Sequence, residues 1–303
     1  MEYRPRIQDD ELAFRLECSG AVLIEGPKWC GKTTIAEHHA KSVLKMQDPD
    51  KKQGYLQTAE TKPSLLLAGK NPRLIDEWQE APVIWDAVRV SIDSRNETGL
   101  YILTGSNSVD KSKISHSGTG RITRMKLETM SLFETGESNG KISLSELFKN
   151  PNLEIEAKSD LEIEQIIFSA CRGGWPGFLA RKSERAQLQI ARDYIDSVCE
   201  TDISTVDGVK RNPLWAAQIL RSYARNISTL AKESNILFPL LRQFPMTHSL
   251  LTFMHLKGCL SFRILKHGVL QSAPQRQFVP AKSANSVTRR LQLPLLVLIQ
   301  NIT

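Results

Sequence analysis

Long apolar segments are missing from this chain of 303 residues. Its longest apolar run, residues 293–299, contains a proline, whereas a membrane-spanning helix needs roughly 20 apolar residues. The first residues, Met-Glu-Tyr-Arg-Pro, also lack the apolar stretch of a signal peptide. We therefore expect no membrane partner and a cytoplasmic location.

Cysteine is scarce, and none of the cysteines forms a Cys-x-x-Cys pair. The five are Cys18, Cys30, Cys171, Cys199 and Cys259. An odd and scattered set fits a reducing compartment better than a framework of disulfides. This again indicates the cytoplasm.

Acidic residues are absent from the end of the chain, because Glu233 is the last of the 33. Residues 234–303 hold eight of the 40 basic residues, so the excess that gives the chain its net charge of +7 lies wholly there. The first 233 residues carry a net charge of −1. Their charge therefore does not favour binding to DNA.

The tail, residues 236–303, is open to two interpretations: a basic arm that binds nucleic acid, or translation in a changed reading frame. A basic arm would be hydrophilic, but this tail contains apolar runs at residues 237–241 and 293–299. Neither helix nor strand periodicity persists in it. We favour the changed frame, and we expect a poorly ordered tail that is not a native domain.

A glycine-rich motif is the most informative feature that is present. Residues 26–34 read Gly-Pro-Lys-Trp-Cys-Gly-Lys-Thr-Thr, which fits the pattern G-x-x-x-x-G-K-[ST] of phosphate-binding loops. The motif follows an apolar run and precedes a helical pattern, which is the context that the mechanism needs. The predicted nucleotide-binding residues are Gly26, Pro27, Lys28, Trp29, Cys30, Gly31, Lys32, Thr33 and Thr34.

Within this motif two side chains have specific chemical roles. The Lys32 ammonium is expected to reach the β- and γ-phosphates of the nucleotide, and the Thr33 hydroxyl to bind Mg²⁺. Backbone N–H groups of the loop would surround the phosphates.

Apolar runs and helical patterns alternate along the first half of the chain. Strands are predicted at 21–25, 44–47, 73–77, 100–104 and 121–127, and helices at 9–16, 33–46, 63–67 and 84–92. This alternation predicts an α/β fold on a parallel sheet. Helical patterns at 161–168, 185–199 and 213–230 then predict a mainly helical region. The expected domain boundaries are 1–135, 136–235 and 236–303.

Two carboxylates end the third predicted strand. Asp76 and Glu77 follow Arg73-Leu74-Ile75, about 45 residues after Lys32, as an intervening helix and strand require. Asp76 would hold Mg²⁺, and Glu77 would act as the base that deprotonates the attacking water.

Two further residues complete the predicted site. Ser106 and its neighbour Asn107 follow the strand that ends at Thr104, and a polar side chain there could hold the attacking water. Arg121 follows Ser117-Gly118-Thr119-Gly120 and could neutralise transition-state charge across a subunit interface. The alternatives are ordinary turn chemistry for Ser106 and a solvated surface arginine for Arg121.

Several motifs in order resemble a known family. They are Gly26–Thr34, Leu74–Gln79, Ile102–Ser106, Ser117–Arg121, Met130–Glu134, Cys171–Gly177, Tyr194–Asp196 and Asp202–Ser204. Together, over roughly residues 15–235, they resemble prokaryotic AAA-type ATPases with a C-terminal domain of unknown function, the domain-of-unknown-function-4143 family. The resemblance implies an AAA-like P-loop domain with Lys32, Thr33, Asp76 and Glu77 in the Walker roles.

The same resemblance implies that Ser106 is a sensor residue and that Arg121 is an arginine finger. Members of the family continue with a winged-helix-like segment and a nuclease-like domain, and the acid-free tail after Asn235 matches neither.

The function that we expect is Mg²⁺-dependent binding of ATP, and its hydrolysis, by a protein that can form a homo-oligomer. The alternative is a DNA-binding regulator that uses ATP as a switch with negligible turnover. A phosphotransferase would need a cluster of lid arginines, and the sequence shows no clear one.

Overall fold

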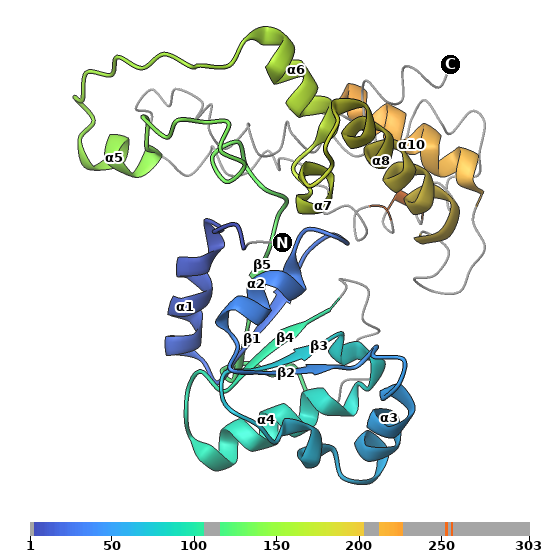
Figure 1. Ribbon diagram of the computed structural model, residues 1–303. Helices are drawn as coiled ribbons and strands as arrows, with labels where there is room; N and C mark the ends of the chain where they lie inside the picture. The colour runs from blue at the N-terminus through green and yellow to red at the C-terminus, as the bar shows by residue number, and fades with distance from the viewer. Residues whose placement is uncertain (1–2, 106–115, 203–211, 227–251, 254–255, 257–303) are drawn as a thin grey trace. The chain divides into compact units, whose positions relative to one another are not determined.

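The computed structural model describes residues 3–105, 116–202, 212–226, 252–253 and 256 (Figure 1). The chain divides into two units, Met1–Glu128 and Thr129–Thr303. This division falls a little before the boundary predicted at residue 135. Clusters of buried apolar side chains lie within each unit.

The first unit is built on a sheet whose strand order is β2-β3-β4-β1-β5. The strands are β1 (Ala21–Glu25), β2 (Ser42–Lys45), β3 (Arg73–Asp76), β4 (Tyr101–Thr104) and β5 (Ile122–Lys126). Every neighbouring pair is parallel. The α/β fold and the parallel sheet predicted from the sequence are therefore confirmed.

Helices cover both faces of this sheet (Figure 1). Along β1, Val22 and Ile24 pack in one cluster with the helices α1 (Gln8–Cys18) and α2 (Lys32–His39). Ala21 and Leu23 pack in the other cluster with α4 (Val83–Arg95). A strand that is apolar on both sides is what a parallel sheet between two helical layers requires.

The helix after the glycine-rich motif is shorter than predicted. α2 ends at His39, and the chain then becomes extended and forms β2, so the predicted helix up to Met46 is wrong. The cause is tertiary, because β2 pairs with β3 and places Leu44 in the core. Three short elements complete the unit: α3 (Lys52–Thr61), η1 (Pro63–Leu67) and η2 (Trp78–Glu80).

The described part of the second unit is helical, as predicted. Its elements are α5 (Leu144–Lys149), α6 (Ile163–Arg172), α7 (Pro176–Leu179), α8 (Glu184–Ser197), η4 (Val198–Asp202) and α10 (Pro213–Arg225). The core contains Trp175, Phe178, Tyr194 and Tyr223. Within the predicted tail, the structure describes Phe253 and Leu256 as buried in this same core; most other tail residues lie outside the described part of the chain.

Within the described ranges, no helix combines the length and the apolar character needed to cross a membrane.

Candidate functional site

The glycine-rich loop connects the end of β1 to the start of α2, and two of its glycines are required by geometry. A Cβ atom on Gly26 would lie 2.3 Å from the carbonyl oxygen of Leu127 and 2.9 Å from Cys30 Sγ. Gly31 has a φ of 99°, in the left-handed region that favours glycine. The loop therefore has the tight, backbone-lined form that a phosphate cradle requires.

The Lys32 side chain is held within this loop. It is only 8% exposed, and its Nζ donates hydrogen bonds to the carbonyl oxygens of Gly26 at 3.0 Å and Pro27 at 2.9 Å. A buried ammonium needs such acceptors, because burial without partners is costly. The loop thus presents the positive charge of Lys32 together with its backbone, which is suited to an anionic ligand.

The rest of the loop differs in exposure. Lys28 and Thr34 are exposed, and Trp29 is 60% exposed at a φ of 64°. Cys30 is buried, and burial raises the pKa of its thiol. The thiol therefore stays neutral at pH 7 and donates a hydrogen bond to the Leu127 carbonyl oxygen at 3.6 Å.

The structure brings Asp76 to the start of α2, as the sequence predicts. Thr33 Oγ1 donates a hydrogen bond to Asp76 Oδ1 at 2.8 Å. Thr104 Oγ1 donates to the same oxygen at 2.5 Å, from the end of the neighbouring strand β4. A hydroxyl and a carboxylate are oxygen ligands of the kind that Mg²⁺ prefers.

Thr104 was not predicted as a site residue. The pairing of β3 with β4 sets Asp76 opposite Thr104, and Thr104 is fully buried. The signal was available in the sequence, because Thr104 is the last residue of a predicted strand beside the one that ends in Asp76. The two loop residues predicted in its place, Ser106 and Asn107, lie outside the described residues.

Glu77 has an unusual backbone. Its φ of 56° and ψ of 49° lie in the left-handed region, where a residue with a side chain is disfavoured by about 1–2 kcal/mol. Gln79 Nε2 donates a hydrogen bond to Glu77 Oε2, and Gln79 Oε1 is buried without a partner among the described residues. Residues with backbone strain of this kind are frequent at functional sites. Gln79, which contacts Glu77, is the second site residue after Thr104 that was not predicted from the sequence.

Arg121 lies at the opposite end of the sheet from the loop. Its carbonyl oxygen accepts a hydrogen bond from Ala21 N, at the start of β1, whereas the loop follows the end of β1. At ~3.3 Å per residue the two ends of β1 are about 13 Å apart. The structure therefore does not bring Arg121 together with Lys32 or Glu77 of the same chain.

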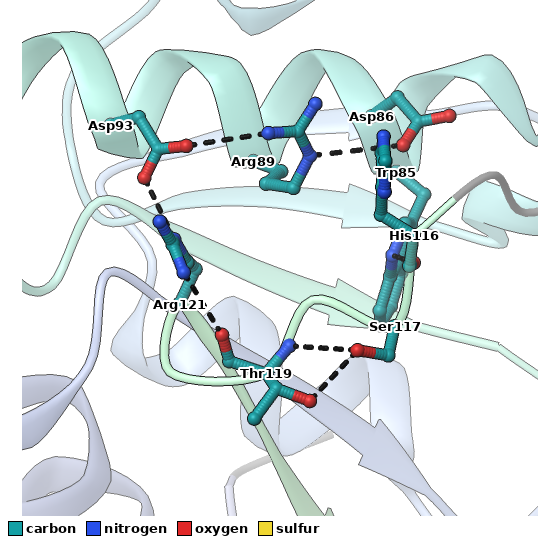
Figure 2. A network of polar contacts seen from close by, with 8 residues as sticks. All are labelled: Trp85, Asp86, Arg89, Asp93, His116, Ser117, Thr119 and Arg121. Carbon is teal, nitrogen blue, oxygen red and sulfur yellow. Dashed lines mark hydrogen bonds and ion pairs between the residues drawn. The ribbon is translucent and has the colours of Figure 1, made fainter.

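A network of charges holds Arg121 in place (Figure 2). Its Nε donates to Asp93 Oδ1 on α4 at 2.8 Å, and its Nη1 donates to the Thr119 carbonyl oxygen at 3.3 Å. Asp93 Oδ2 in turn accepts from Arg89 at 3.3 Å. Arg121 is 47% exposed in this arrangement, so its guanidinium is oriented but still accessible.

Comparison with protein families identifies two regions. Residues 19–136 match the AAA domain family, which supports the predicted AAA-type ATPase and nucleotide binding. Residues 163–240 match a domain of unknown function, DUF8612. The resemblance named another family for this region, the domain-of-unknown-function-4143 family, and no match supports that assignment.

Comparison with solved structures agrees with the fold. The chain is similar to a Walker-type ATPase of Pyrococcus abyssi, with a TM-score of 0.50 and 14% identity over 85% of this chain and 90% of that chain. At this identity the similarity shows the fold alone. A DNA replication initiation factor is matched at 16% identity over 85% and 93% of the two chains, with a TM-score of 0.32 that is too low to indicate a common fold. No curated protein matches the sequence.

Proposed function

We propose that the AAA domain binds ATP together with Mg²⁺ and hydrolyses it. The observation that carries this proposal is the hydrogen bond of 2.8 Å between the Thr33 hydroxyl and Asp76, at the residue that follows the buried Lys32 in the chain. One cation, one hydroxyl and one carboxylate are thus gathered at the start of α2, as a nucleoside triphosphate site needs. Titration of the purified chain with ATP, with and without Mg²⁺, followed by measurement of phosphate release, tests it.

The loop residues would bind the phosphates. In the structure Lys32 donates to two loop carbonyls, and the phosphate oxygens are stronger acceptors that would take over these hydrogen bonds. The N–H groups at the start of α2 add to the attraction, since the N-terminus of a helix carries partial positive charge.

Thr33 and Asp76 would hold the metal ion. Both ligand groups offer oxygens, and Thr104 also donates to Asp76 Oδ1 and so helps to hold the carboxylate in place. The residues present therefore fit Mg²⁺. When bound, Mg²⁺ would neutralise charge that develops on the phosphate oxygens.

Glu77 would act as the general base. It follows Asp76 directly, and its left-handed backbone turns the chain out of β3 at that point. Gln79 holds one oxygen of its carboxylate, which leaves the other to accept a proton from water. Ser106 as a residue that positions the same water stays part of this proposal.

Arg121 would act on the nucleotide of a neighbouring subunit, because it lies at the far end of the sheet from its own loop. We therefore expect Arg121→Ala to lower turnover about a thousandfold without weakening ATP binding. Specific activity of the unaltered protein should also rise with its concentration. Arg95→Ala is the matched control, since Arg95 is an α4 arginine paired with Glu97 and Asn71.

Mixing two inactive variants shows whether Arg121 acts on the nucleotide of a neighbouring subunit or on that of its own subunit. Arg121→Ala and Glu77→Gln proteins, each inactive alone, should recover part of the activity when combined, because a mixed interface restores one complete site. Full activity of Arg121→Ala protein, or activity of the unaltered protein that does not depend on concentration, would remove Arg121 from the mechanism.

A chain that ends after Asn235 should keep its affinity for ATP within about twofold, because all the proposed ligands lie in the first unit. The truncation removes Phe253 and Leu256 from the helical core, so the second unit should lose stability. Calorimetric titration and thermal unfolding measure the two effects separately.

Limited proteolysis of the full chain tests whether the tail comes from a changed reading frame. A resistant fragment that extends well past residue 260 would contradict that interpretation.

The competing function is an ATP-switched regulator that binds DNA and has negligible turnover. A net charge of −1 over the first 233 residues does not favour it. ATP binding without phosphate release, in the unaltered protein with Mg²⁺ at any concentration, would support this alternative.

A further inference from the structure

A buried arginine outside the matched AAA region contacts the phosphate-binding loop. Arg6 precedes α1 and is only 7% exposed. Its Nη1 donates a hydrogen bond to the Cys30 carbonyl oxygen at 2.9 Å, and its Nη2 donates to the Glu128 carbonyl oxygen at 2.7 Å. One planar guanidinium thus joins the loop to a segment about a hundred residues further along the chain.

The contact with Cys30 fixes the orientation of a peptide group in the loop. A trans peptide is planar, and its carbonyl oxygen and the following N–H point to opposite sides. Since the carbonyl of Cys30 points to Arg6, the N–H of Gly31 points away from it. Gly31 immediately precedes Lys32, and the N–H groups at this point are those that phosphate-binding loops present to the ligand.

The contact with Glu128 ties the loop to the end of the first unit. The carbonyl oxygen of Leu127, the residue before it, accepts the hydrogen bond of Cys30 Sγ and lies 2.3 Å from the place that a Cβ on Gly26 would take. Leu127 N also donates to Glu25 O at 2.7 Å. Glu128 is the last residue of the first unit. The loop therefore contacts the segment that ends this unit.

Arg6 is itself held firmly on the helix that follows the loop. Its backbone N–H donates to Asp9 Oδ2 at 2.7 Å, and Asp9 Oδ1 accepts from the Tyr3 hydroxyl at 2.6 Å and lies 2.8 Å from His39 Nε2 on α2. Burial alone would raise the pKa of Asp9, but these hydrogen bonds hold it below its usual value. The carboxylate therefore stays charged at neutral pH and keeps Arg6 in position.

We propose that Arg6 is a positioning residue for ATP binding. It holds the Cys30–Gly31 peptide in the orientation that binds phosphate, and it links occupation of the loop to the order of the Leu127–Glu128 segment. This inference rests on the proposed binding of ATP, but it adds a residue and a coupling that the motif does not contain.

The test compares Arg6→Met with Arg6→Lys and with Arg4→Met, a control in which an exposed arginine two residues away is changed. Arg6→Met should weaken ATP binding between about tenfold and a hundredfold, the range that hydrogen bonds to a charged group are worth. Arg6→Lys should bind with intermediate affinity, because a single flexible ammonium replaces the two fixed guanidinium nitrogens that contact the two carbonyls. Arg4→Met should bind as the unaltered chain does.

The effect of ATP on amide hydrogen exchange distinguishes a positioning role of Arg6 from a general loss of stability. Saturating ATP should slow exchange of the amides at residues 127 and 128 in the unaltered chain and in Arg4→Met, but not in Arg6→Met or Arg6→Lys at equal occupancy. If Arg6→Met does not fold, Arg6→Lys decides the question by the same two measurements.

Two results would overturn the inference while leaving ATP binding intact: unchanged affinity in the Arg6 variants, or ATP-dependent protection at residues 127 and 128 that survives in them. If the unaltered chain binds no ATP, the proposed function fails and the role of Arg6 falls with it.

Discussion

Replacing Lys32 with alanine is expected to weaken ATP binding about a hundredfold or more, since the charged donor that would bind the phosphates is lost. The ammonium is 8% exposed and sits between the carbonyl oxygens of Gly26 and Pro27. Without it, those carbonyls would face the phosphates with no intervening cation. Calorimetric titration with ATP in the presence of Mg²⁺ measures the loss.

Two controls keep this measurement specific. Lys45→Ala removes a 54% exposed lysine that pairs with Glu37 on the outside of α2, and it should leave the affinity unchanged. Lys32→Met keeps the apolar stem of the side chain and removes only the charge, so it should lose as much affinity as alanine. Affinity that is unaltered in both Lys32 variants would contradict the assignment of the loop.

The central part of the fold could be predicted because its signals are local. The strands at Ala21–Glu25 and Tyr101–Thr104 are short runs that are apolar up to their last residue, and their burial on both faces follows from a parallel sheet. The boundary between α2 and β2 could not be predicted, because a run such as Ser42-Val43-Leu44-Lys45 is compatible with either structure. Only its pairing with β3 decides it.

The candidate site, too, could be predicted only where a local motif marks its residues. Lys32, Thr33, Asp76 and Glu77 were predicted from a motif whose spacing carries its own chemistry, and the structure brings Thr33 to Asp76. Gln79 and Arg6 were missed because single polar residues carry no pattern, whereas Thr104 was marked only by its place at the end of a predicted strand. Their contacts with Asp76, Glu77 and Cys30 depend on how distant segments pack.

The role proposed for Arg121 depends on contact between two subunits. Arg121 is at the wrong end of the sheet to reach its own loop, because it precedes β5 whereas the loop follows the parallel strand β1. It makes the oligomeric state a condition for activity in the proposed mechanism, whereas ATP binding requires only one chain.

The second large effect is expected at Glu77. Glu77→Gln should keep ATP binding and lower turnover at least about a hundredfold, which is within the range for loss of a general base. Glutamine has nearly the same shape and can still occupy the position beside Gln79, but its amide cannot accept the proton of the attacking water. Release of phosphate at saturating ATP measures the effect, and titration shows that binding is retained.

Glu80→Gln provides the matched control. Glu80 lies three residues further on, at the end of η2, and its carboxylate is occupied by Lys52 at 2.6 Å and by Gln47 at 2.9 Å. These partners hold the pKa of Glu80 below its usual value, and they keep its carboxylate engaged with α3 and with the turn after β2. Turnover should therefore stay within about twofold of the unaltered chain, the scatter expected of a surface substitution. If Glu77→Gln keeps as much turnover as Glu80→Gln, Glu77 is not the base, and another group must activate the attacking water.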